Sequence, residues 1–369
     1  MKKIIFALAV LTMAVACNKD QVVDQQTPNA ISFGNVFVDK ATRAAIDRSY
    51  NSLNLDKFYV YGIITNNKTG KYANIFCNVD VTRSVDDDET VWSYDPKFTQ
   101  YWIPGNTYNF TAIVDGNVNR GTQDEPEYAT GVRIDEENET RNDEMPTHID
   151  LYDASEQPDI LYAESGDIAC TSIDEDKIVA FTFNHLMSKA KFTVSNVMAN
   201  PSGYAYKVRD ICITNAAKTA TYTIGAGWGK PSWKDAKEET YQLMFGNAVK
   251  NSDEKEADYI YSYTNGTYDS VESRFEHLLI PTYKSDEKTT IEVEFICELY
   301  KDNVLIQDII KHASTSALLE AGHAYNFSIA LGEPGKPIKF TVIDVNGWDR
   351  DLDGDNEVDT NHDVATQPK

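Results

Sequence analysis

Short segments in which apolar and polar residues alternate recur along the chain from residue 31 to residue 345. They are rich in β-branched and aromatic residues, and turn-forming residues bound most of them. Alternation of this kind is typical of strands with one buried face. The predicted strands are ISFGNVFV (31–38), FYVYGIIT (58–65), ANIFCNV (73–79), TVWSYD (90–95), TYNFTAIV (107–114), IVAFTF (178–183), KFTVSNV (191–197), RDICITN (209–215), TATYTI (219–224), RFEHLLIPT (274–282), TTIEVEFICELY (289–300), AYNFSIAL (324–331) and IKFTVIDV (338–345).

Long amphipathic helices are missing from this pattern. Only DKATRAAIDRSYNSL (39–53) and TSALLEAG (315–322) have a locally helical composition. A length of 369 residues suggests about two domains. The spacing of the strands therefore predicts an all-β protein made of two antiparallel β-sandwich domains. NHLMSKA (184–190) is the best position for their boundary.

Two polar stretches interrupt the strands. Residues 115–159 are acidic and contain little apolar sequence, and residues 247–270 form a second polar insertion. We expect the first stretch to form long surface loops on the first domain.

The N-terminal segment MKKIIFALAVLTMAVAC has two lysines, a short apolar run and small residues before Cys17. This is the pattern of a secretory signal, and the run is too short to span a membrane. The cysteine makes it resemble a bacterial lipoprotein signal, removed as residues 1–16, although Ala14 stands where Leu is usual. The alternative is an ordinary signal peptide cut near Ala16. Acyl chains on Cys17 would anchor the protein to a membrane, with residues 17–30 as a polar tether.

The formal net charge of −24 argues against nucleic acid and anionic membrane surfaces as partners. The remaining cysteines are single and lie in strand-like sequence, without a CxxC pair, so we predict buried thiols; spacing alone leaves a disulfide open. They are Cys77, Cys170, Cys212 and Cys297.

No motif for catalysis stands out. The six histidines are too far apart in sequence for HxH or HExxH, and no GxSxG is present. GAGWGK (225–230) has Ile224 and Pro231 where a phosphate-binding loop needs Gly and Ser or Thr, so it is interpreted as a turn. Paired carboxylates carry no specificity in a chain this acidic. We therefore predict no enzymatic activity and no cofactor.

The C-terminal segment DRDLDGDNEVDT (349–360) partly matches a calcium-binding loop. Thr360 stands where the closing acidic ligand belongs, so a solvated acidic tail over 349–369 is favoured and a weak calcium site is the alternative. The candidate ligands are Asp349, Asp351, Asp353 and Asp355.

Several segments, in this order, resemble the fimbrillin family of Bacteroidetes, the subunits of type V pili related to the FimA and Mfa groups. The resemblance covers most of residues 31–348. Its most specific parts are the aromatic stretch WSYDPKFTQYWIPG and the FNH motif containing Phe183 and His185. The other matching segments are TRA (42–44), FYVYGII, DILYAES (159–165), LLIPT (278–282), AGHAYNFSIAL (321–331) and NGW (346–348).

The resemblance implies two transthyretin-like sandwiches, over 31–187 and 188–348, and export as a lipoprotein to the outer membrane. It also implies that an Arg-specific protease cuts the loop after the first strand, at Arg43–Ala44 or at Arg48. The first strand then leaves, and a strand of another pilus subunit takes its place. The residues that would leave are Ile31, Phe33, Val36 and Val38.

The segment 338–348 is either the donor strand or the last strand of the second domain, with Ile338, Phe340, Val342 and Val345 as its apolar positions. The acidic tail after it would make an awkward donor, which leaves stalk, tip and accessory roles open. In this setting His185 is expected to hydrogen-bond at a strand crossover, and Trp92 and Trp102 to lie in the core. A surface lipoprotein that binds glycan or another ligand without polymerising is the alternative.

Overall fold

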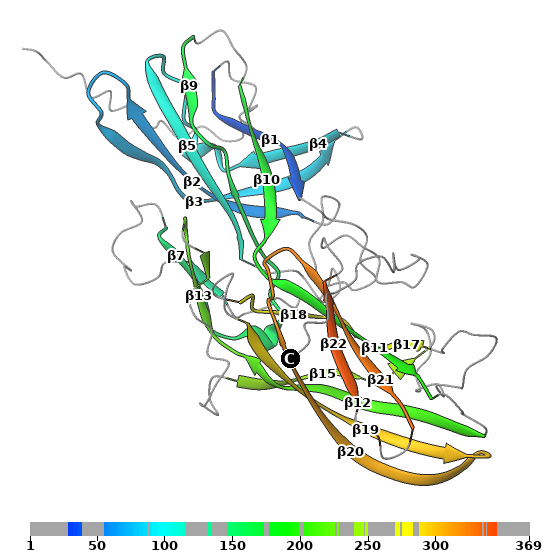
Figure 1. Cartoon of the computed structure of the whole chain (residues 1–369). Helices are drawn as coiled ribbons and strands as arrows, with labels where there is room; N and C mark the ends of the chain where they lie inside the picture. The colour runs from blue at the N-terminus through cyan, green and yellow to red at the C-terminus, as the bar shows by residue number, and fades with distance from the viewer. Residues whose placement is uncertain are drawn as a thin grey trace, which may run out of the picture.

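The computed structural model is built almost entirely of β-strands (Figure 1). It describes residues 29–38, 55–86, 89–115, 132–134, 146–172, 177–198, 203–225, 227–228, 240–246, 248–249, 270–273, 275–282, 288–333, 336 and 338–344. None of these residues forms a helix long and apolar enough to cross a lipid bilayer. The two short 3-10 helices are η1 (Pro96–Phe98) and η2 (Ala154–Glu156).

The first sheet holds eight strands in the order β1-β10-β8-β5-β2-β3-β4, with β9 paired to β5. It occupies the upper part of Figure 1. Its strands are β1 (Ser32–Val38), β2 (Lys57–Asn66), β3 (Tyr72–Asp86), β4 (Glu89–Tyr94), β5 (Asn106–Asp115), β8 (Ile160–Glu164), β9 (Ile168–Cys170) and β10 (Ile178–His185).

Three further sheets occupy the lower part of Figure 1, with orders β16-β17-β11-β21-β22 (β18 pairs β11), β15-β12-β19-β20 and β14-β13-β7-β6. Their strands are β6 (Val132–Ile134), β7 (His148–Leu151), β11 (Ser188–Asn196), β12 (Tyr204–Ala217), β13 (Ala220–Thr223), β14 (Gly227–Trp228), β15 (Thr240–Gly246), β16 (Ala248–Val249), β17 (Ser270–Ser273), β18 (His277–Leu279), β19 (Thr289–Lys301), β20 (Val304–Ala317), β21 (Ala324–Leu331) and β22 (Lys339–Asp344).

The buried side chains form two hydrophobic clusters, and Tyr61, Ile113 and Ile160 of the first sheet belong to the second cluster. Side chains from β1–β5 and β8–β10 form one cluster, in which Phe58, Phe110 and Phe181 are fully buried. A second cluster around Phe192 and Phe327 joins β11, β12, β19 and β21. The all-β prediction is therefore confirmed. The sequence predicts antiparallel pairing throughout, and this is wrong for two pairs, since β1–β10 and β11–β21 are parallel.

The acidic stretch 115–159 is not entirely surface loop, so that expectation is wrong for its last part. β7 pairs with β6 and β13, and the side chains of Ile149 and Leu151 are buried in the second cluster. Ile149 and Leu151 lie on the same face of β7, and burial of that face specifies how the strand is placed although its other face is polar. Chain from before residue 160 thus contributes to the second core, and the domain limits 31–187 and 188–348 stay a prediction.

The helical expectation for 315–322 is wrong. Residues up to Ala317 belong to β20, and Leu319 is fully buried after the strand ends. Burial against the second core outweighs the helix propensity of Ala, Leu and Glu in this short segment. The other helical candidate, 39–53, lies outside the described residues.

Three of the four thiols are buried as predicted. Cys170, Cys212 and Cys297 are buried and free, and Cys77 is half-buried. Burial raises the pKa of the Cys212 thiol to about 11 and that of Cys297 to about 12, so both stay protonated at neutral pH.

Candidate functional site

The first strand stands at one end of the first sheet. β1 runs parallel to β10, with Phe33 opposite Val179 and Val38 opposite Phe183. β10 continues past this ladder, so that Asn184 and His185 pair with β8 instead. β1 is therefore joined to the sheet through β10 alone in the strand order (Figure 1).

Although it lies at the end of the sheet, β1 supplies side chains to the first core. Ile31, Phe33 and Val38 are buried, and Val36 packs against the same cluster. The inward positions change from odd to even between Phe33 and Val36. Asn35 makes this change, because its φ of 50° is left-handed and the register with β10 shifts there.

Phe33 is the centre of an aromatic group. Its ring centroid lies 5.4 Å from that of Phe76, 5.7 Å from Tyr94, 5.8 Å from Phe110 and 5.9 Å from Phe181. Three of these pairs are edge-to-face and the pair with Phe181 is stacked, and both geometries add to the free energy of burial. The Phe33 side chain thus packs against rings from β3, β4, β5 and β10.

Hydrogen bonds hold the beginning of β1 against the opposite end of the sheet. The Tyr94 hydroxyl donates to the Ile31 carbonyl oxygen at 2.6 Å, and the Ile31 N–H donates to the Gln100 carbonyl oxygen at 2.8 Å. The Trp102 N–H donates to the Asn29 carbonyl oxygen at 2.9 Å. Burial raises the pKa of Tyr94 to about 12, so its hydroxyl remains a donor at physiological pH.

The aromatic residues singled out in the sequence lie around this strand. Trp92 and Trp102 are 8% and 3% exposed, which confirms that both belong to the core. The Trp102 indole N–H donates to the Lys177 carbonyl oxygen just before β10. The segment WSYDPKFTQYWIPG (92–105) therefore packs and hydrogen-bonds against the beginning of β1.

His185 ends β10, and its Nδ1 lies 2.8 Å from Asp159 Oδ1. Both side chains are buried. The contact joins the segment just before β8 to the end of β10, where the chain passes from the first sheet to the second core. It confirms the predicted hydrogen bond at a crossover. Asp159 was visible in DILYAES, but its burial could not be foreseen in so acidic a chain.

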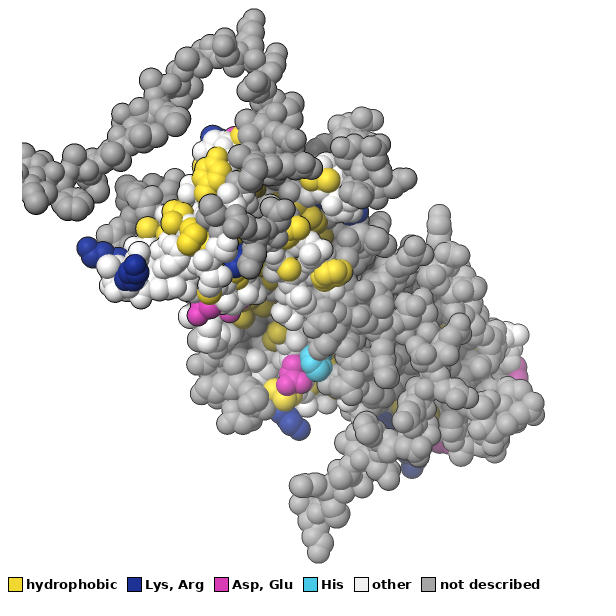
Figure 2. Space-filling view, turned by 90° about the horizontal axis from the view of Figure 1, so that it is seen from above, with side chains coloured by type: hydrophobic (Ala, Val, Ile, Leu, Met, Phe, Trp, Pro, Cys, Tyr) yellow, Lys and Arg dark blue, Asp and Glu magenta, His cyan; other side chains and the backbone are white. Residues whose placement is uncertain are grey.

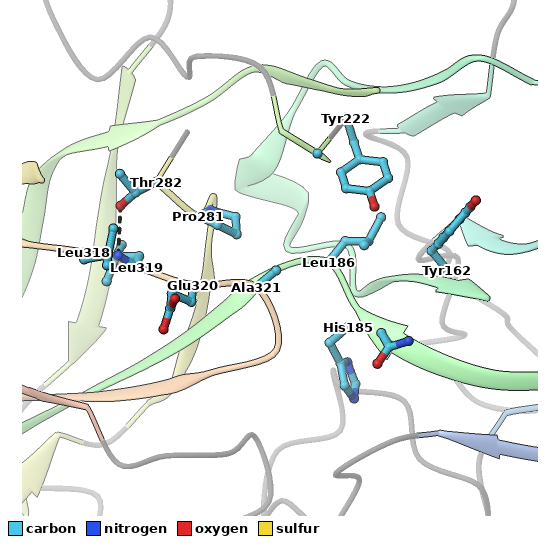
Figure 3. A pocket seen from close by; sticks show the side chains of 12 residues that line it. Tyr162, His185, Leu186, Tyr222, Pro281, Thr282, Leu318, Leu319, Glu320 and Ala321 are labelled. Atoms are coloured by element: carbon cyan, nitrogen blue, oxygen red, sulfur yellow. Dashed lines mark hydrogen bonds between the residues drawn. The ribbon is translucent and has the colours of Figure 1, made fainter. Parts of the chain in front are cut away.

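A cavity of about 500 Å³ lies beside this crossover (Figure 3). The rings of Tyr162 and Tyr222 line one side, with centroids 5.9 Å apart and planes inclined by 54°. The Tyr162 hydroxyl donates to the Glu164 carboxylate. The pKa values of both tyrosines are raised, mainly by burial and to a smaller extent by the nearby Glu164 carboxylate. The other lining residues are Asn184, His185, Leu186, Gly227, Pro281, Thr282, Leu318, Leu319, Glu320 and Ala321.

This cavity is of a size and composition that suits a compact ligand with one apolar face. Leu186, Pro281 and Ala321 provide apolar walls in Figure 3, and Glu320 supplies a carboxylate. No sequence pattern indicates this cavity, because Tyr162 and Tyr222 are far apart in the chain.

The last strand, β22, is part of the sheet with the order β16-β17-β11-β21-β22. β22 pairs antiparallel with β21, and the Phe340 ring lies 6.1 Å from that of Phe327. Ile338 and Val342 also pack against the second cluster.

The other predicted positions lie outside the described residues. They are Cys17, Arg43, Ala44, Arg48, Val345, Asp349, Asp351, Asp353 and Asp355. Within the described part of the chain, no group of three or more His, Cys, Asp or Glu residues is placed to hold a metal ion.

The comparisons with known proteins decide the family. The model of the fimbrillin-like family matches residues 42–348. The chain belongs to this family. No curated protein sequence matches this fimbrillin-like chain. A fimbrial protein from Bacteroides vulgatus shares its fold with a TM-score of 0.58 at 12% identity, covering 87% of this chain and 99% of that one.

Two other solved structures match the fimbrillin-like chain with lower scores. A putative cell adhesion protein from Bacteroides uniformis has a TM-score of 0.38 at 14% identity and covers 87% of this chain and 97% of that one. A fimbrial assembly protein from Parabacteroides distasonis has a TM-score of 0.36 at 8% identity and covers 84% and 93%.

Proposed function

We propose that this chain is a structural subunit of type V fimbriae at the outer membrane and cell surface, in a stalk, tip or accessory position, and that it supports adhesion. Membership of the fimbrillin-like family supports a fimbrial role. The observation that carries the proposal is the position of β1, which stands at the end of its sheet and yet provides Phe33 and Val38 to the core, together with Ile31 just before it.

Such a strand suits assembly by strand exchange. Its removal would break one ladder, to β10, and would open an apolar groove around Phe76, Phe110 and Phe181. The groove would also expose unpaired backbone groups of β10. A strand from another subunit would fill the groove with apolar side chains and pair with the exposed backbone groups of β10.

Cleavage by an Arg-specific protease is the proposed trigger. Arg43 and Ala44 lie between Val38, the last residue of β1, and β2, so a cut there would separate β1 from the rest of the sandwich. The same cut would free the body of the protein from the acylated Cys17. A single event would then release the subunit and make β1 displaceable.

The candidate donor strand is β22 with the residues that follow it. β22 and the residues up to 348 have the required alternation, and β22 lies at the end of its own sheet order next to β21. A donor role would need β22 to leave Phe327, whereas an anchor or tip role would leave it in place.

The test is treatment of the purified precursor with an Arg-specific protease. We expect a cut after Arg43, followed by multimers that resist SDS and appear as a ladder on gels. An Arg43→Ala variant should stay uncut and monomeric, and an Arg48→Ala variant serves as the matched control. A cut only elsewhere, or a clean cut without multimers, would count against polymerisation by this route.

A second candidate is a surface lipoprotein that binds glycan and does not polymerise. The cavity beside Tyr162 and Tyr222 favours it, and Figure 2 shows hydrophobic side chains exposed on the surface seen from above. Tyr72 and Tyr101 are 74% and 49% exposed. Binding to a glycan array that is lost in Tyr222→Ala, together with retention of uncut protein on cells, would support this function instead.

A further inference from the structure

One long strand of the second part has nothing to do with the exchange of β1. β20 is 14 residues long and stands at the end of the order β15-β12-β19-β20. In Figure 1 it forms the outer margin of the lower part. Edge strands are usually short or interrupted by proline and charge, because an open edge pairs with other chains. β20 contains no proline.

Exposed apolar side chains lie along β20, which pairs with β19 and which β22 also approaches among the described residues. Val304, Leu305, Ile306 and Ile310 are 66%, 48%, 53% and 58% exposed. Large aliphatic side chains exposed together on one edge strand mark an interaction surface rather than a solvated face. The half-buried positions from Ile309 to Thr315 alternate with exposed ones, so Asp308, Ile310, His312 and Ser314 share the outer face.

Charged groups flank Ile310 on that outer face. Asp308 Oδ2 lies 3.4 Å from Arg209 Nη2 of β12, and His312 Nδ1 lies 3.5 Å from Glu294 Oε2 of β19. These contacts hold Asp308 and His312 in place two residues before and two residues after Ile310.

We propose that β20 pairs antiparallel with β20 of a second copy of this chain, about a two-fold axis that passes through Ile310. A two-fold axis perpendicular to the sheet keeps outer faces on the same side, so residues whose numbers add to 620 face each other. Ile310 then lies opposite the second copy's Ile310. Asp308 lies opposite the second copy's His312, and this pair occurs twice.

The neighbouring registers are poorer. An axis through Lys311 sets the two lysines against each other, and an axis through Asp308 does the same for two carboxylates. An axis through Ile309 places Asp308 against Ile310. Of these four axes, only the one through Ile310 both pairs two isoleucines and places Asp308 opposite His312. This complementarity of β20 with itself is the reason to propose a second copy as its partner.

The contact goes beyond the proposed function and does not depend on it. Strand exchange through β1 is head-to-tail and can continue along a filament, whereas a two-fold contact closes after two copies. The β20 contact would therefore join subunits, or the filaments that they form, side by side. The small edge area and the net charge of −24 on each copy make it a weak contact.

Cysteine cross-linking tests the register directly. In the full-length chain carrying Cys17→Ser, an added Ile310→Cys substitution places two thiols on the axis, where opposite Cα atoms are about 5 Å apart and a disulfide fits. We expect a covalent dimer on mild oxidation. Asp308→Cys chains should cross-link only when mixed with His312→Cys chains, since Asp308 lies about 13 Å from its own equivalent. The parent chain with its native thiols is the control.

Sedimentation velocity tests the affinity. Ile310→Lys puts two like charges on the axis and should weaken dimerisation by at least about tenfold. Val91→Lys, at a position 42% exposed on β4, is the matched control and should dimerise like the parent. Circular dichroism confirms that each variant is folded. A parent chain that stays monomeric at high concentration, or cross-linking in another register, would overturn the proposal.

Discussion

The hydroxyl of Tyr94 on β4 donates a 2.6 Å hydrogen bond to the carbonyl oxygen of Ile31 at the start of β1. The two residues belong to opposite ends of the strand order of the first sheet. This bond therefore closes the sheet on itself at the point where β1 begins.

Tyr94→Phe removes this donor and leaves the Ile31 carbonyl oxygen without it. We expect the free energy of unfolding to fall by about 1 to 2 kcal/mol, which urea denaturation measures. The variant should also show a weaker decline of stability at high pH. An unfolded tyrosine ionises near pH 10 and folded Tyr94 near 12.

Between those values the unfolded chain has lost a proton that the folded chain retains, so rising pH favours unfolding. The stabilising contribution of Tyr94 is complete below pH 10 and is lost as the pH passes 12. Tyr206, whose pKa burial also raises to about 12, contributes in the same range and remains in the variant. Equal pH slopes for parent and Tyr94→Phe would contradict this account.

Phe33 and Phe37 lie on the same strand and differ in burial. Phe33 is 4% exposed and Phe37 is 58% exposed. Phe33→Ala should lower the free energy of unfolding by roughly 3 to 5 kcal/mol, because it leaves a cavity among four aromatic rings. Phe37→Ala should change it by less than about 0.5 kcal/mol. Similar losses in the two variants would show that β1 is not seated as described.

The buried pair of His185 and Asp159 has a partly exposed counterpart in His148 and Asp150. Asp159→Ala removes the partner of a histidine whose side chain is 1% exposed, and we expect a loss of roughly 3 kcal/mol. The His148–Asp150 pair is partly solvated at 3.4 Å, so Asp150→Ala should cost less than about 1 kcal/mol. Thermal unfolding of both variants makes the comparison, and equal shifts would count against a role for the crossover.

Thiol reactivity tests the burial of the cysteines. At pH 8 the native chain should react slowly with a thiol reagent at Cys212 and Cys297, because their raised pKa values leave little thiolate. Half-buried Cys77 is the position where labelling of the folded protein should start. In urea, Cys77, Cys170, Cys212 and Cys297 should all react fast, and rapid labelling of Cys297 in the native chain would be inconsistent with the fold.

The sequence was most informative where one strand face is apolar. ISFGNVFV alternates, and it forms β1; Trp92 and Trp102 are aromatic residues inside predicted strands or turns, and both are core. The family resemblance added what periodicity could not, namely a reason to single out Phe183 and His185.

The failures have physical causes. β20 escaped prediction because both of its faces are largely exposed near its start, so VLIQDII shows no period of two. TSALLEAG has helix-forming residues, but its position is decided by Leu319 in the second core. The cavity beside Tyr162 and Tyr222 depends on the packing of distant segments, which a single sequence does not specify.

The short link between β10 and β11 has a mechanical consequence. Only Leu186 and Met187 separate the two strands, and both are buried. The Leu186 N–H donates to the Ile160 carbonyl oxygen, and the Met187 carbonyl oxygen accepts from the Gly322 N–H. Force applied to a strand paired with β10 is therefore transmitted directly to β11 and the second core, because the two-residue link can hardly extend. A subunit that bears tension along a fibre requires such a link.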